Sequence, residues 1–311
     1  MATAATALIN AETVLALSNI KKEVAALLTA NATNHAETPA LGQYSTAAYN
    51  ALQAAYNAAD ATQESLETAI AAFKKAKNLP VFTISGTKDY VVGKSIYDNN
   101  SGTLYFKATN NYDKSMWWAF DQTTTTVGVT EKVVVTNYAT DRTFWGAPSV
   151  KITETSENDT EDGIFLLYTE GNGTPVHFQN DNQVIVRWSS TEANSGSAMT
   201  FTYIGNTYDL AQLTDAHIEA LSALQTSANT NAKYVGVEIG SGLGQYTGNK
   251  EAFNTAIANA QAIQSKTVVE VAAMNVADIT AITTALTESA ATFKLNMPTA
   301  GFYRVKSMNA N

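Results

Sequence analysis

The sequence predicts a multidomain protein of α and β structure, with a β domain between two helical bundles. The chain has 311 residues, enough for two or three domains of ordinary size. Its composition changes twice, from an Ala-rich segment to one rich in Thr, Val, Tyr, Gly and Asn, and back again. A motif of the first helical segment also recurs in the second. We therefore expect domains at 1–79, 80–210 and 211–297, followed by a short end at 298–311.

Composition and charge exclude several classes of protein. Hydrophobic residues make up 45% and charged residues 15%, which excludes global disorder. The net charge is −9 and no Lys/Arg cluster is present, so no nucleic-acid partner is expected. No apolar run reaches the roughly 18 residues of a membrane span. The chain lacks Cys, and His35, His177 and His217 have no ligand spacing, so we expect neither a metal site nor a cofactor.

The first 79 residues predict an up-down three-helix bundle. Apolar residues of the first helix recur at steps of three and four, the period of one buried stripe: Val14, Leu17, Ile20, Val24, Leu27 and Leu28. A second helix is expected over roughly 45–61. The third has Leu66, Ile70 and Phe73 on its inner face. It ends at Asn78-Leu79-Pro80, because proline cannot continue a helix.

Residues 211–297 predict a second bundle because they repeat motifs of the first. Leu41-Gly42-Gln43-Tyr44 recurs as Leu243-Gly244-Gln245-Tyr246, and Asn78-Leu79-Pro80 recurs as Asn296-Met297-Pro298. Residues 298–311 would then begin a truncated β domain, and the chain would be a fragment of a longer protein built from such units. The alternative is a degenerate C-terminal strand that caps the second bundle.

The middle segment predicts a β-trefoil. It breaks into three stretches, each of which ends in a short apolar strand, at 116–120, 164–167 and 198–201. Clusters of Asn, Asp, Ser and Gly mark hairpin turns between shorter strands. Three similar four-strand units closing into one barrel form the trefoil plan, which removes exposed sheet edges.

One stretch of this segment resembles a repeat of the ricin-B-type (R-type lectin) β-trefoils. The similarity rests on Gly93–Asp98, Leu104–Lys107, Asn110-Asn111 and Ser115–Phe120. That family ends each repeat in a Gln-any-Trp motif, and here Met116 and Trp118 stand in those places. More loosely, the helical segments resemble the FIVAR-type three-helix modules of large secreted bacterial proteins, through spaced Tyr, Leu and Ala.

The resemblance implies sugar-binding residues. Sites of this family combine an Asp or Asn, an aromatic platform for the apolar face of the sugar, and an amide or acid on a later loop. In the first repeat these would be Asp98, Tyr105 and Asn110 or its neighbour Asn111, and in the third Gln179 and Trp188. The alternative for Asp98 is a turn-capping residue, and for Trp188 a half-buried strand aromatic.

Two adjacent tryptophans add one more candidate. Trp117 and Trp118 point to opposite faces of a strand, so one is expected in the core and the other is a candidate for contact with a ligand. Of the two, Trp118 is named as the candidate carbohydrate-binding residue. The second repeat has Phe144-Trp145-Gly146 where the family has Asp, which argues against a site there.

No catalytic motif accompanies these residues. The acidic stretch 154–162 lacks EF-hand spacing and is expected to be a solvated loop. The glycines of 240–244 lie between helices, so they do not form a nucleotide-binding loop. No nucleophile elbow, zinc-protease helix or phosphate loop is present, so an enzyme is not expected.

Together these features favour a carbohydrate-binding, lectin-like module of a larger secreted or cell-surface bacterial protein. Its partners would be a glycan or polysaccharide and further domains of the same parent chain. The alternative is a set of structural spacer domains of a surface protein or adhesin, without a ligand of their own. The first residues, from Met1 to Ala4, carry no basic region of a signal peptide, so the localisation is an inference from the family and the composition.

Overall fold

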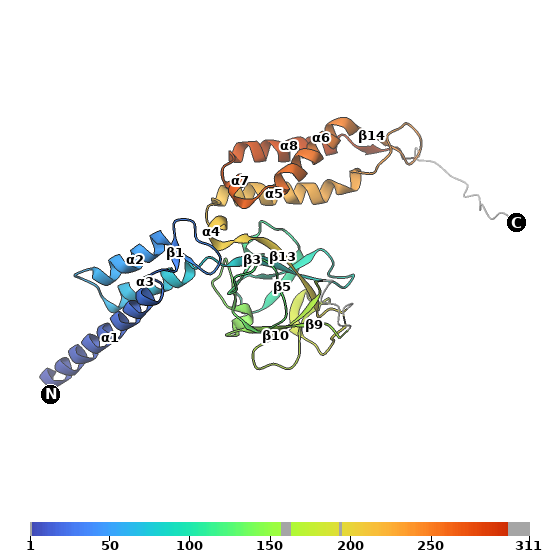
Figure 1. Ribbon diagram of the computed structural model, residues 1–311. Helices are drawn as coiled ribbons and strands as arrows, with labels where there is room; N and C mark the ends of the chain where they lie inside the picture. The colour runs from blue at the N-terminus through green and yellow to red at the C-terminus, as the bar shows by residue number, and fades with distance from the viewer. Residues whose placement is uncertain (1, 157–162, 193–194, 298–311) are drawn as a thin grey trace. The chain divides into compact units, whose positions relative to one another are not determined.

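The computed structural model describes residues 2–156, 163–192 and 195–297. The chain divides into two compact units, Met1–Gln212 and Leu213–Asn311 (Figure 1). The first unit combines helices with a large antiparallel sheet, and the second is largely helical. The short end at 298–311 and most of the predicted acidic loop, at 157–162, lie outside the described residues.

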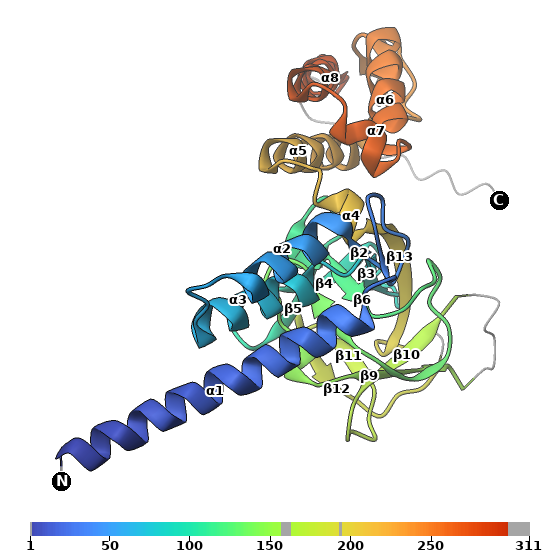
Figure 2. The same ribbon diagram turned by 60° about the vertical axis from the view of Figure 1, so that its left-hand side comes forward.

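Three helices pack against one another at the start of the first unit: α1 (Ala2–Ala30), α2 (Thr46–Asn57) and α3 (Gln63–Lys75). Ser45 caps α2, and Thr62 forms a capping box with Ser65 at the start of α3, which satisfies free backbone N–H groups there. The helices share a buried core of Val24, Tyr44, Leu52, Leu66, Ile70 and Phe73. Figure 2 shows α1 running on past the other two, and Val14 on this part is 68% exposed.

Within the described residues of the first unit, eleven strands form one large sheet. They are β3 (Pro80–Gly86), β4 (Lys94–Asp98), β5 (Leu104–Ala108), β6 (Trp118–Phe120), β7 (Thr130–Val133), β8 (Val135–Asn137), β9 (Val150–Glu154), β10 (Phe165–Thr169), β11 (Val176–Gln179), β12 (Val184–Arg187) and β13 (Ala198–Asn206). All of the pairings between them are antiparallel. A short helix, α4 (Thr207–Leu210), follows β13.

A path of paired strands, completed by the chain connection between β7 and β8, leads from β3 back to β3. From β3 it runs through β6 to β8, and β7 precedes β8 directly in the chain. From β7 it continues through β9, β10 and β13 back to β3. Closure of this kind protects strand edges from pairing with other chains. The apolar faces of the strands enclose one core, which includes Phe82, Trp118, Phe120, Phe144 and Phe178.

The second unit contains four helices in its described residues: α5 (Asp215–Asn231), α6 (Lys250–Gln264), α7 (Val268–Ala272) and α8 (Val276–Ala291). Helices α5, α6 and α8 pack against one another. A two-stranded sheet of β14 (Tyr246–Thr247) and β15 (Lys294–Leu295) closes this unit. In the first unit, a small parallel sheet of β1 (His35–Ala36) and β2 (Tyr44–Ser45) lies at the position that corresponds to β14.

Candidate functional site

The register of the sheet places two predicted site residues in one row. Gln179 of β11 lies opposite Val184 of β12, Val184 lies opposite Tyr105 of β5, and Tyr105 lies opposite Tyr97 of β4. All four are half-buried, and their neighbours along each strand point into the core. The rings of Tyr97 and Tyr105 are 5.9 Å apart. Gln179 and Tyr105, assigned by sequence to different repeats, thus share one outward face.

Trp188 stands further along the same face. Its indole is 62% exposed, and its ring centre lies 6.0 Å from that of His177. The backbone N–H of Trp188 donates to the carbonyl of Pro175, which extends the ladder between β11 and β12 by one residue pair. A Cβ on Gly196 would come within 2.5 Å of His177 Cε1 and would also meet the Tyr90 hydroxyl, so a larger residue at this position would displace these rings.

The imidazole of His177 is uncharged. Its Nδ1 lies 2.9 Å from Ser197 Oγ, and Ser197 is fully buried. Burial lowers the pKa of His177, and the positive charge of Lys88 lowers it further. The imidazole is therefore neutral at neutral pH and combines one donor nitrogen with one acceptor nitrogen. A flat indole beside a neutral imidazole is suited to an uncharged ligand that has both an apolar face and hydroxyl groups.

Asp98 does not belong to this face, contrary to the role that the resemblance implies. It pairs with Leu104 in the ladder, so its side chain points away from the side of the sheet that carries Tyr105. Only 2% of Asp98 is exposed. Its carboxylate accepts from the Asn100 N–H at 2.7 Å, from Thr140 Oγ1 at 2.9 Å and from Arg142 Nη1 at 3.2 Å. Asp98 is thus a turn-capping residue, which is the alternative role that the sequence left open for it.

Trp118 is also unavailable to a ligand, which corrects its selection as a stacking residue. Both Trp117 and Trp118 are completely buried. Trp118 belongs to the core of the sheet and donates from Nε1 to the Ile96 carbonyl. Trp117 points the other way, where it donates to the Asn111 carbonyl at 2.7 Å and packs on Tyr138. A strand pattern predicts opposite faces, but it does not show that a loop covers the outer one.

Asn110 stabilises the loop that follows β5. Its side-chain oxygen accepts from the N–H of Tyr112 at 2.9 Å, and its own N–H points to the sulfur of Met116. Trp145, in the stretch where the second repeat lacks Asp, packs against the core and lies under the guanidinium of Arg187 at 4.4 Å. Both residues stabilise local structure, so the surface with Trp188, His177, Tyr105, Tyr97 and Gln179 is the candidate site. We call it the Trp188 face.

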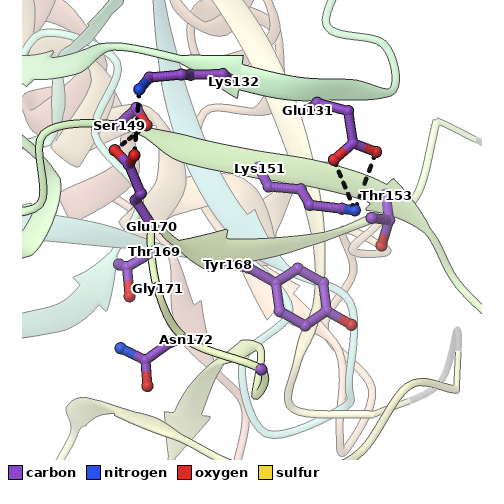
Figure 3. A pocket seen from close by; sticks show the side chains of 11 residues that line it. Glu131, Lys132, Ser149, Lys151, Thr153, Tyr168, Thr169, Glu170, Gly171 and Asn172 are labelled. Carbon is purple, nitrogen blue, oxygen red and sulfur yellow. Dashed lines mark hydrogen bonds and ion pairs between the residues drawn. The ribbon is translucent and has the colours of Figure 1, made fainter.

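A pocket of about 450 Å³ on other strands was not anticipated from the sequence (Figure 3). Its walls come from β7, β9, β10 and the turn after β10, and they include Glu131, Lys132, Ser149, Lys151, Tyr168, Glu170 and Asn172. The sequence of β10, Phe-Leu-Leu-Tyr-Thr, does not alternate between apolar and polar residues, so it gives no signal that Tyr168 points outward. The strands that converge on Tyr168 are distant in the chain.

Within the part of the chain that the structure describes, no group of three His, Cys, Asp or Glu side chains is arranged to hold a metal ion. None of the helices described is both long and apolar enough to cross a bilayer.

Comparison with known proteins gives three structural likenesses, of which two are described here. No family model matches the chain, and no curated protein matches its sequence. A GlcNAcα1-4Gal releasing endo-β-galactosidase from Clostridium perfringens matches over 40% of this chain and 32% of its own, with 11% identity and a TM-score of 0.31. A Polyporus squamosus lectin bound to a human-type influenza-binding epitope matches over 58% of this chain and 74% of its own, with 12% identity and a TM-score of 0.32. Neither TM-score reaches 0.5, so the functional argument rests on the residues of this chain.

Proposed function

We propose that this protein is a non-catalytic carbohydrate-binding module whose ligand lies on the Trp188 face. The observation that carries the proposal is Trp188, a tryptophan 62% exposed and yet fixed beside His177. An exposed indole loses apolar contact with the protein, and a sugar offers an apolar CH face that restores it. The neutral imidazole of His177 and the amide of Gln179 can exchange hydrogen bonds with sugar hydroxyls.

The shape of this face favours a chain of sugars over a single ring. Trp188 and Val184 are four residues apart on one strand, or roughly 14 Å at about 3.4 Å per residue. Tyr105 and Gln179 flank Val184 on either side. An oligosaccharide lying along β12 would therefore stack on Trp188 at one end and meet Tyr105 and Gln179 at the other.

The proposal includes the architecture and setting that the sequence suggests. The sheet would be a β-trefoil of the R-type lectin kind, which the return of the path of strands to β3 supports. The helical segments would be FIVAR-like spacers, and the domains would follow the boundaries expected from sequence. The parent would be a secreted or cell-surface bacterial protein, in which this module holds further domains near a glycan.

A structural spacer is the second candidate. Two residues that were expected to bind sugar have structural roles instead, which favours a spacer. Asp98 accepts a hydrogen bond from Arg142, and Trp118 is buried in the core. On this reading, Trp188 is an exposed aromatic residue without a ligand.

A glycan array on the full chain separates the two candidates. The variants are Trp188→Ala, which removes the stacking surface, and Trp188→Tyr, which keeps an aromatic ring. Tyr203→Ala, at an aromatic residue of β13 that is 40% exposed, is the matched control. We expect binding by the wild type, the Tyr variant and the control, and a loss of roughly tenfold or more for Trp188→Ala. A folded wild type that binds no glycan would establish the spacer, and undiminished binding by Trp188→Ala would move the site elsewhere.

A further inference from the structure

The pocket of Figure 3 is formed by side chains that converge from three strands and a turn. Lys151 of β9 lies opposite Tyr168 of β10 in the ladder, and Glu131 of β7 binds Lys151 from the other side. Figure 3 shows the two ion pairs along one side of the pocket, with Tyr168 and Asn172 on the other. Gly171 turns the chain at a φ of +79°, which brings the segment 171–173 to the rim.

Glu170 is a fixed acceptor in the wall of this pocket. Ser149 Oγ, on a residue only 2% exposed, donates to its Oε2 at 2.7 Å, and Lys132 Nζ donates to its Oε1 at 3.1 Å. The hydrogen bonds from Ser149 and then Lys132 lower the pKa of Glu170, so the carboxylate stays ionised well below neutral pH. A carboxylate has about four lone-pair sites, and these two donors leave capacity for hydroxyl groups of a ligand.

The charges that line the pocket compensate one another. Lys132 pairs with Glu170, and Lys151 pairs with Glu131 at 2.8 Å. The two cations and two anions sum to zero, so neither an anion nor a cation finds an unmatched partner here. The ring of Tyr168 supplies an apolar surface, and Asn172 supplies both an amide donor and an acceptor. A volume of about 450 Å³ is in the range of small-molecule sites.

From these features we propose that the pocket is a second carbohydrate-binding site, specific for a neutral sugar unit. The sugar would rest an apolar face on Tyr168 and donate hydroxyl hydrogens to Glu170, with Asn172 contacting a further hydroxyl. The site is built from β7, β9 and β10, whereas the Trp188 face is built from β4, β5, β11 and β12. The inference is therefore independent of the first site, and two sites on one domain would raise the avidity for a polymeric glycan.

The test is a ligand titration of the full chain followed by amide chemical shifts. The probes are the methyl glycosides of glucose, galactose, mannose and N-acetylglucosamine, with glucuronate and inorganic phosphate as charged probes. Each is added to the wild type and to Trp188→Ala, which removes the first site. Tyr168→Ala and Glu170→Gln are then made in the Trp188→Ala background, with Tyr168→Phe as the matched control that keeps the ring.

We expect at least one neutral glycoside to shift the amides of Lys151, Tyr168 and Asn172 in the Trp188→Ala protein. Glu170→Gln should weaken this binding roughly tenfold, because it replaces charge-assisted hydrogen bonds by neutral ones. Tyr168→Ala should weaken it at least as much, and Tyr168→Phe should leave it unchanged.

Three results would overturn the inference. The first is that Trp188→Ala abolishes every response, in which case the Trp188 face is the one sugar site and the proposed function stands. The second is a pocket that responds to glucuronate or phosphate but to no neutral glycoside. The third is a pocket that responds to none of the probes. Because the Trp188 face is proposed to bind a chain of sugars, the glycan array tests that face separately. Near-ultraviolet circular dichroism shows that each variant is folded.

Discussion

The two helical segments close in the same way. In each, a glycine with φ of +84° (Gly42) or +83° (Gly244) turns the chain and donates its N–H to an asparagine carbonyl, at 2.7 Å to Asn78 and 2.9 Å to Asn296. The asparagine N–H donates back to the residue after the glycine, at 2.8 Å in both segments. The repeat in sequence is thus a repeat of one backbone closure, in which glycine is needed for its left-handed conformation.

The surroundings of the two closures differ. Asn78 is 2% exposed, donates to the Pro39 carbonyl at 2.7 Å and accepts from the Tyr208 N–H at 3.1 Å. It therefore joins the loop that contains Pro39 to α4, the short helix that follows β13. Asn296 is half-buried and donates to the Gly240 carbonyl at 2.8 Å. The comparison teaches that one motif can serve either as a local closure or as a buried junction, depending on what packs over it.

The aromatic contacts show the same contrast. Tyr44 stacks directly on Phe73, with ring centres 4.0 Å apart. In the second unit, Tyr246 and Phe293 are 6.3 Å apart, and Tyr234 stacks on Phe293 instead at 4.8 Å. The segment between Tyr246 and Phe293 is longer than the one between Tyr44 and Phe73 and includes α7. In the second unit a third ring, that of Tyr234, therefore takes part in the closure.

The largest predicted difference between the closures comes from their asparagines. Asn78→Ala removes a donor from the Pro39 carbonyl and an acceptor from the Tyr208 N–H in a buried place, and should lower the free energy of unfolding by about 2–4 kcal/mol. Asn296→Ala should cost about 1 kcal/mol, because water can replace its bond. All four tryptophans lie in the first unit, so their fluorescence during urea unfolding reports that unit.

Hydrogen exchange of peptides from α5, α6 and α8 reports the second unit, and each variant is the control for the other. The Asn78 variant should leave exchange in α6 unchanged. Equal losses of stability in the two units would contradict the distinction between junction and closure.

The next effect concerns the two glycines. Alanine at either position adopts a left-handed conformation, at a cost of about 1 kcal/mol or slightly more. A Cβ on Gly42 would also lie 2.9 Å from Thr123 Cγ2, whereas nothing lies within 4 Å of one on Gly244. Gly42→Ala should therefore destabilise its unit by about 2 kcal/mol and Gly244→Ala by about 1 kcal/mol. Adding Thr123→Ser, which removes that methyl group, should make the two losses equal in denaturation experiments. If the serine brings no recovery, the crowding at Gly42 is not the source of the difference.

The smallest effect is expected from an ion pair between the first helices and the sheet. Lys77 Nζ lies 2.6 Å from Asp121 Oδ1, and both side chains are partly exposed. Because solvent screens such a pair, Lys77→Met should change the free energy of unfolding by less than about 0.5 kcal/mol. Urea unfolding at low and high salt measures this. A loss above about 1 kcal/mol that disappears at high salt would show that charge joins the helices to the sheet.

Local sequence signals predicted the helices better than the site. Val24, Leu66, Ile70 and Phe73 are buried as expected, because a stripe of period 3.6 depends on neighbours in sequence. Val14, expected in the same stripe of α1, is 68% exposed. Trp188 was predicted as an aromatic platform for a sugar, and it is exposed. Asp98 and Trp118 were chosen by resemblance to a repeat, and their surroundings are set by Arg142 and by the core, which no local pattern shows.

The sequence by itself predicted the inner faces of the first helices, the repeated Leu-Gly-Gln-Tyr motif and the candidate status of Trp188, because each depends on residue types within a few positions of one another. The closure between this motif and its asparagine joins residues far apart in the chain, so only the structure shows it. Only the tertiary structure decided which strands become neighbours. It placed Gln179 and Tyr105 in one row of the sheet. It also brought Glu131, Ser149 and Glu170 to the pocket with Tyr168. These juxtapositions follow from the register of strands distant in the chain, which depends on the packing of the whole sheet.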